Sequence, residues 1–229
     1  MDRSGEIAAV GEQARVVLED KHGARETTLL ASRRAIRSCA MAIRAVHRRD
    51  IEEARELIAV AAAYLAEANA ALEGHDDVRY GGFLHDAKKE FAEANLTLAF
   101  VSGQPIPAPE EIGVEIPAYL NGMAEAASEL RRQVLDCLRR GEINEAESLL
   151  TTMDEVYGLL VTVDYPDALT GGLRRTTDGL RAVLERTRGD VTTALVAARF
   201  QAAVDGHLDG AHRGEREEAG GNLAGSAGV

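Results

Sequence analysis

Apolar side chains recur every three or four residues along most of this chain, which is the spacing of an amphipathic helix. Residues 5–47 contain no proline and place Leu29, Ile36, Ile43 and Val46 at that spacing. No segment shows the strict alternation of apolar and polar residues that a half-buried strand needs. The pattern therefore predicts an all-α fold, an antiparallel bundle of about six to seven long helices.

Glycine, proline and aspartate mark where these helices should begin and end. Asp50 is a suitable N-cap, Gly74 a helix stop, and Pro117 suits the first turn of a later helix. The expected helices cover approximately residues 5–47, 51–74, 76–102, 117–141, 142–161 and 172–207. The third of these passes through Gly81 and Gly82, where we expect a kink.

The chain reads as one domain with a tail. Residues 1–208 are predicted to form the helical bundle, and the Gly-rich segment 209–229 is predicted to be disordered. Long, alanine-rich helices often bury spare apolar stripes against other subunits, so an oligomer is expected. We expect no membrane span and no secretory signal, because no apolar run is long enough. Two cysteines with no metal or disulfide spacing favour a cytoplasmic location.

The charge balance is unusual for a protein that binds nucleic acid. The net charge is −12, with 38 acidic and 26 basic residues, and only three of the basic residues are lysines. An acidic, lysine-poor chain rich in alanine and glycine is typical of a halophilic protein adapted to high salt, although an ordinary acidic cytosolic enzyme has a similar charge. In molar salt, charges are screened within about 3 Å, so local basic patches matter more than the net charge.

Two acidic sets suggest a site for a divalent cation. Asp86, Glu90, Glu93 and Thr97 fall within an arc of about 60° on the expected helix 76–102. Glu125 and Glu129 share a face of helix 117–141, on the side opposite its main apolar stripe. If the two helices are neighbours, the carboxylates would converge on Mg²⁺, Mn²⁺ or Ca²⁺. The alternative is a solvated acidic face, because about one residue in six in this chain is acidic.

Arginines gather in two places. One run lies near the end of the first helix and the other in the helix 172–207, and both are candidate phosphate contacts. The alternative is that these arginines pair with acidic residues along their own helices. Few aromatic side chains accompany them, so any binding of a strand would depend mainly on phosphates.

Three segments, taken in order, resemble the translin family in its archaeal form: EFAEA at 90–94, PAYLNGMAEAASELRR at 117–132 and RRTTDGLRAVLERTRGDVT at 174–192. The first helix, ending AIRAVHRRD, also fits, and the resemblance covers about residues 20–200. It implies an all-α bundle of seven helices that assembles into a hollow octamer and binds single-stranded RNA or DNA.

The resemblance also implies a catalytic site. In the catalytic branch of the family, translin-associated factor X, four acidic residues on the inner wall bind a divalent cation and cleave RNA. The matching positions are Glu90, Glu93, Glu125 and Glu129. The catalytic branch has Asp where this chain has Glu125, and translins that only bind nucleic acid lack the acidic set.

We therefore expect an Mg²⁺- or Mn²⁺-dependent endoribonuclease for single-stranded RNA, assembled as a homo-oligomer. The four glutamates would be both its catalytic residues and its metal ligands. The expected strand contacts are Arg33, Arg34, Arg37, Arg44, Arg48, Arg79, His85, Arg174 and Arg175. Two alternatives stay open: a non-catalytic shell that binds single-stranded RNA or DNA, and a structural scaffold that binds proteins.

Overall fold

A computed structural model describes residues 3–79 and 82–221, and within these residues the chain forms eight helices and no strand. Six of the helices are long: α1 (Arg3–His47), α2 (Ile51–Ala71), α4 (His85–Ser102), α5 (Ile116–Arg140), α6 (Ile143–Leu160) and α8 (Leu173–Gly221). Two are single turns, α3 (Asp76–Arg79) and α7 (Asp167–Thr170). The predicted all-α class is confirmed.

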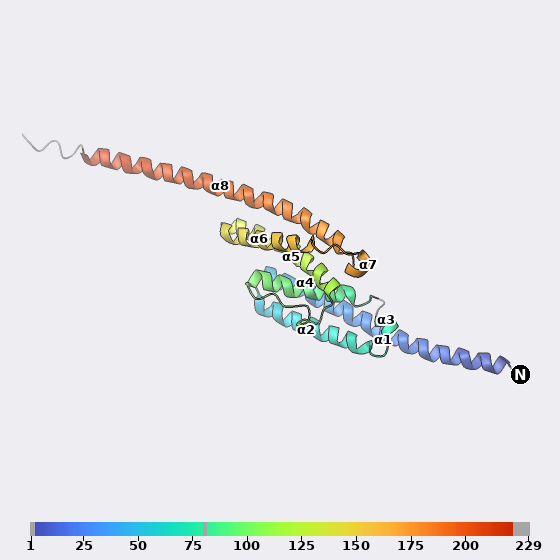
Figure 1. Cartoon of the computed structure of the whole chain (residues 1–229). Helices are drawn as coiled ribbons and strands as arrows, with labels where there is room; N and C mark the ends of the chain where they lie inside the picture. Colours follow the sequence, from blue (N-terminus) through green and yellow to red (C-terminus); the bar gives the residue numbers. More distant parts are fainter. Residues whose placement is uncertain (1–2, 80–81, 222–229) are drawn as a thin grey trace, which may run out of the picture.

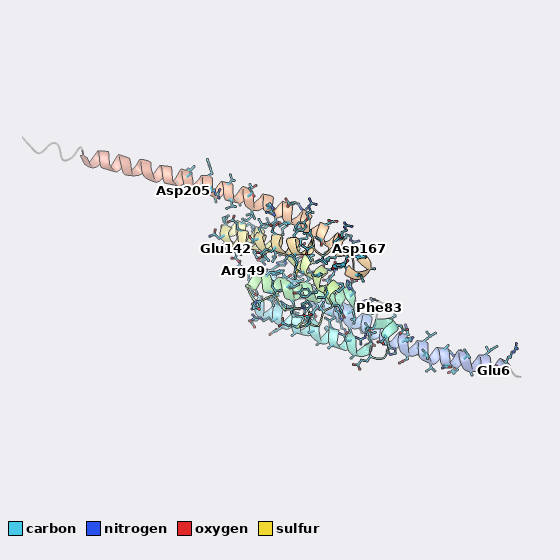
Figure 2. All side chains as sticks on the ribbon, viewed as in Figure 1. Glu6, Arg49, Phe83, Glu142, Asp167 and Asp205 are labelled. Atoms are coloured by element: carbon cyan, nitrogen blue, oxygen red, sulfur yellow. The ribbon has the colours of Figure 1, made fainter. Side chains whose placement is uncertain are left out.

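The long helices pack in a stack with α5 near its centre (Figure 1). The helix α1 lies against α2 and α4, α4 lies against α5, and α5 in turn contacts α6 and α8. The first part of α1 and the last part of α8 project from opposite ends of this body. Figure 2 labels Glu6 on one projecting part and Asp205 on the other, and both side chains stand away from the bundle.

The core is built largely from alanine and medium-sized aliphatic residues, which let the helices approach closely. One apolar cluster joins α1, α2, α4 and the first half of α5, with fully buried alanines such as Ala35 and Ala94. It also includes Leu160 of α6 and Leu180 of α8. A second cluster joins the second half of α5 to α6 and α8, through Leu130, Met153 and Leu184 among others. The two clusters meet along α5.

Several helix ends form as their residues predict. The Asp50 carboxylate accepts a hydrogen bond of 3.1 Å from the backbone N–H of Glu53 and so caps α2. Pro117 lies in the first turn of α5, and Gly141 ends that helix with a left-handed φ of 76°. Across the tight turns at this end of the bundle, Arg49 and Glu142 form an ion pair of 3.6 Å.

The structure has two helices where the sequence predicts one. The single helix expected over 76–102 is two helices, because α3 ends at Arg79 and α4 begins at His85. Gly82 between them has a φ of 82°, which no helix residue adopts, so the chain turns here and does not merely kink. The turn places α4 as a separate element against α1 and α5.

The end of the chain also differs from the expectation. The last helix, α8, runs on as helix to Gly221, past residue 209, where the sequence predicts the start of a disordered tail. The segment contains no proline, and its Glu, Arg and Ala residues are strong helix formers. Residues 222–229 lie outside the described part. Across the described residues, no helix combines the length and the apolar character that crossing a membrane would require.

Candidate metal centre and nucleic-acid surface

Three of the four predicted ligands come together where α4 lies against α5. Glu90 and Glu93 are one helical turn apart on α4, and Glu125 reaches them from α5. One carboxylate oxygen from each lies within 4.8 Å of the other two. The structure therefore brings together Glu90, Glu93 and Glu125, which are 35 residues apart in sequence at their widest.

A glycine allows the two helices to meet this closely. Gly122 lies on α5 one turn before Glu125, and its Cα faces the backbone of α4. A Cβ at this position would lie 2.6 Å from the Lys89 carbonyl oxygen and 2.9 Å from the Glu93 nitrogen. Since no side chain fits between the helices here, Gly122 sets the spacing at which the carboxylates face one another.

The fourth predicted ligand, Glu129, is held by a different contact. Its carboxylate is 2.7 Å from Nε2 of His47, whose side chain at the end of α1 is only 3% exposed. On the other side of the ring, Nδ1 of His47 lies 3.3 Å from Nε2 of Gln133. Because the Gln133 amide donates to Nδ1, the proton of a neutral ring is on Nε2 and points at Glu129.

These contacts set the charge of the acidic groups. The hydrogen bond from His47 lowers the pKa of Glu129, so this carboxylate is ionised. Burial, followed by the nearby negative charges of Glu90, Glu125 and Glu129, raises the pKa of Glu93 to about 9. Burial also raises the pKa of Glu90. Without a cation, Glu93 therefore stays protonated at neutral pH.

Lys89 supplies the nearest positive charge. Its Nζ donates to Glu125 at 2.9 Å and lies 3.4 Å from Glu90. Burial alone would lower the pKa of Lys89, but the hydrogen bond to Glu125 and the charges of both glutamates raise it, so the group stays an ammonium.

The donor set fits a hard divalent cation. It consists of carboxylate oxygens on two packed helices, which are the ligands that Mg²⁺ and Mn²⁺ prefer. The one thiol near the site, Cys39, is a poor ligand, because burial and the charges of Glu90 and Glu93 raise its pKa to about 12. The second sign of fit is the position of Glu93, which is buried beside other carboxylates; burial first, and then the charges of Glu90, Glu125 and Glu129, raise its pKa.

The predicted strand contacts fall into two groups. Five arginines are exposed and form no ion pair with any residue that the structure describes: Arg33, Arg37, Arg44, Arg174 and Arg175. The first three share the face of α1 that points away from its buried side. These five remain available to an anion, whereas the alternative of pairing with acidic residues holds for Arg48, with Glu53, and Arg188, with Glu185.

The other predicted contacts have partners within the chain. The guanidinium of Arg34 lies over the ring of Tyr64, 5.7 Å from its centroid, and Arg48 forms an ion pair with Glu53. Arg79 donates to the backbone oxygen of Asn69 at 3.3 Å. His85 lies against the backbone of Gly171, where a Cβ would come within 2.8 Å of its ring. The structure gives these four residues local structural contacts.

One basic surface was not found by the sequence reasoning. A groove of about 570 Å³ runs along α5 from Glu129 and is lined by Ser128, Glu129, Arg131, Arg132, Leu135, Asp136 and Arg139. Arg131 pairs with Asp190 at 2.8 Å, and the exposed Arg139 pairs with Asp136 at 3.5 Å. Arg132 is exposed and forms no ion pair with any residue that the structure describes. The sequence signal for this groove is the spacing of Glu125, Glu129 and Arg132, which places an arginine on the same helix face as the two glutamates. The groove thus joins two exposed arginines to Glu129.

Solved structures of other proteins share this fold. No family model matches the chain. An uncharacterized protein of Methanocaldococcus jannaschii is 30% identical over 178 residues, which cover 77% of this chain and 78% of that protein. AfC3PO, solved alone and in complex with duplex RNA, is 33% identical to the present chain in both structures, with TM-scores of 0.73. The matches cover 81% of this chain and 97% and 96% of theirs, and C3PO proteins are of the translin and translin-associated factor X type.

This chain belongs to the translin family. The family expected from the three sequence segments is therefore confirmed. The structure of apo-NeC3PO, at 19% identity and a TM-score of 0.69, covers 82% of this chain and agrees with it in fold.

Proposed function

We propose that this translin-family chain is a metal-dependent endoribonuclease that hydrolyses single-stranded RNA within a hollow homo-oligomer, for which the family suggests an octamer. The observation that carries the proposal is the convergence of Glu90, Glu93 and Glu125 from two helices onto one point. A solvated acidic face does not explain it, because Glu93 is buried and its pKa is raised.

Four glutamates would bind the metal, and His47 would position one of them. Glu90, Glu93 and Glu125 would hold Mg²⁺ or Mn²⁺, which when bound supplies a Lewis acid for the phosphate and lowers the pKa of a water. Glu129 is the fourth proposed ligand, and the hydrogen bond from His47 keeps its carboxylate ionised and oriented. Glu93 must release its proton for all four carboxylates to serve as ligands.

The basic residues would bring the strand to this point. AfC3PO has been solved in complex with duplex RNA, which supports RNA as the ligand of this relative. In the present chain, the groove beside Arg139 and Arg132 reaches Glu129, the fourth proposed ligand, and would carry the strand to it. The exposed face of Arg33, Arg37 and Arg44 offers further phosphate contacts.

Single-turnover cleavage of an end-labelled single-stranded RNA tests the proposal. Reactions contain Mn²⁺, Mg²⁺ or EDTA in a high-KCl buffer, and wild type is compared with Glu93→Gln. We expect internal cuts that need the metal and that the variant loses by at least about a hundredfold, as expected for removal of a group that stabilises the transition state. Glu67→Gln is the matched control, because Glu67 is an exposed glutamate on α2 and should leave cleavage unchanged.

The outcomes separate the proposal from its rival. Cuts that persist in Glu93→Gln or in EDTA would contradict the assigned site. Binding without any cleavage would support the second candidate, a non-catalytic shell for single-stranded RNA or DNA. That candidate is favoured by one observation, the ammonium of Lys89, which already gives Glu90 and Glu125 a cation of their own.

A further inference from the structure

Lys89 is the one side chain at the carboxylate cluster whose role the proposed function does not use. Its side chain is only 21% exposed, and its ammonium bridges Glu90 on its own helix and Glu125 on α5. Lysine is seldom buried unless it is paired, because its ammonium is strongly hydrated. Here it is paired twice, with carboxylates that we assign to a metal.

The neighbouring lysine shows that this placement is specific. Lys88 is also buried, but it points to the other side of α4, where it forms an ion pair with Glu115 in the loop before α5. Lys21, the third and last lysine of the chain, pairs with exposed Asp77 on α3 at 2.5 Å. Lys89 alone of the three contacts the cluster.

The chemistry of the ammonium explains what it does there. An ammonium is a compact point charge on a flexible arm, and it binds the carboxylate lone pairs that a divalent cation also needs. Both cations cannot hold the same oxygen of Glu125 at the same time, and at short range they repel each other. The arm of Lys89 has four methylenes, so the ammonium can leave while the backbone of α4 stays in place.

We propose that Lys89 is the resident counter-ion of the carboxylate cluster, and that a divalent metal displaces its ammonium from Glu90 and Glu125. This inference rests on the metal site proposed above and adds an exchange step to it. In the metal-free chain Lys89 holds the helices together across the acidic contact. In the loaded chain its ammonium lies next to the metal, where it can contact a phosphate of a bound strand.

The exchange can be measured in the wild-type chain, because only three lysines are present. The protein is treated briefly with an acetylating reagent for amines, with and without Mg²⁺, and labelling at each lysine is read by peptide mass spectrometry. We expect labelling of Lys89 to rise about tenfold or more with Mg²⁺, since a released amine is exposed. Lys21 and Lys88 are internal controls whose labelling should stay constant. Unchanged or slower labelling of Lys89 in Mg²⁺-saturated protein would overturn the exchange.

A pair of variants tests the competition itself. Lys89→Met removes the charge and Lys89→Arg keeps it, and the Kd for Mn²⁺ is measured by electron paramagnetic resonance on the full chain. Lys89→Met should bind Mn²⁺ about tenfold more tightly than wild type, because no ammonium then competes with the metal for Glu90 and Glu125 or repels it. Lys89→Arg should stay near or above the wild-type Kd, and Lys21→Met should match wild type.

The results distinguish failure of the inference from failure of the proposed function. If wild type binds Mn²⁺ and Lys89→Met binds it equally or more weakly, Lys89 organises the ligands and does not compete with the metal. If neither protein binds Mn²⁺, the metal site and the exchange both fall. If only Lys89→Met binds Mn²⁺, Lys89 blocks the wild-type site, and the exchange falls because the metal does not displace the ammonium. The labelling experiment needs no variant, so a folding defect in Lys89→Met does not decide the question.

Discussion

The contact at Gly122 gives a prediction whose size follows from the structure. An alanine Cβ would lie 2.6 Å from the carbonyl oxygen of Lys89 and 2.8 Å from Cβ of Ala92, whereas ordinary contact begins at about 3.4 Å. The atoms in the way are backbone or Cβ atoms of α4, which no change of rotamer can remove. The helices α4 and α5 would therefore have to separate by roughly 0.8 Å in Gly122→Ala, the difference between these two distances.

This separation should affect metal binding more than stability. Overpacking costs about 1–3 kcal/mol, and alanine in a helix returns about 1 kcal/mol relative to glycine. The net loss is thus at most about 2 kcal/mol, or a Tm lower by about 4–8 °C for a chain of this size. Glu125 would move away from Glu90 and Glu93 by the same shift, and we expect the Kd for Mn²⁺ to rise about tenfold or more, because such sites tolerate only about 0.5 Å.

Calorimetric unfolding and Mn²⁺ titration measure the two effects, with Gly158→Ala as the matched control. Gly158 is an exposed helical glycine of α6, and an alanine Cβ there would meet nothing within 4 Å, so this substitution should raise the Tm by about 2–4 °C and leave the Kd unchanged. A Gly122→Ala protein with wild-type Tm and wild-type Kd would refute the close contact of α4 and α5. A lower Tm with an unchanged Kd would refute the assignment of the ligands.

Three further predictions concern charge and buried hydrogen bonds. The folded chain keeps the Glu93 proton between its ordinary pKa near 4.5 and about 9, so the metal-free Tm should fall as pH rises through that window. Mn²⁺ should release close to one proton at neutral pH, as calorimetry in buffers of different ionisation enthalpy would show, and Glu93→Gln should abolish both effects. His47→Phe removes the donor to Glu129, and urea unfolding should show a loss of about 2 kcal/mol, whereas no loss would mean that this hydrogen bond is not formed. The side-chain amide of Asn121 donates to the backbone oxygens of Pro117 and Thr170, each at 2.8 Å, so Asn121→Ala should lower the free energy of unfolding by about 2–3 kcal/mol in the same assay. A change below about 0.5 kcal/mol, the effect of an ordinary surface substitution, would contradict the role of Asn121 in joining α5 to α7.

Much of the fold could be predicted from the sequence because the signals that define it are local. The spacing of apolar residues gave the long helices, and Asp50, Pro117 and Gly141 gave ends that the structure confirms to within a few residues. The turn between α3 and α4 was mistaken for a kink, since a glycine pair is compatible with both and only the φ of Gly82 decides. The glycine content of residues 209–221 predicts disorder, whereas their lack of proline permits the helix that the structure has up to Gly221.

The candidate site was predictable only in part. The helix wheel placed Glu90 with Glu93, and Glu125 with Glu129, because each pair lies within one helix. The distance between the pairs depends on how α4 meets α5, which Gly122 sets and periodicity does not report. The partners Lys89 and His47 reach the carboxylates across helix interfaces, so their contacts were visible only in the structure.

The position of α5 between the two apolar clusters has a consequence for how the protein opens. Its first half is packed by α1 and α4, with α6 and α8 joining through Leu160 and Leu180, and its second half is packed by α6 and α8. Neither half of the bundle can therefore detach without exposing a flank of the same helix. Local openings on the two sides should therefore be coupled, and the amides of α5 should exchange with deuterium only in the rare global event. A cation bound at the seam of α4 and α5 would then slow exchange in α6 and the packed part of α8 as well, because one shared helix transmits the protection to both halves.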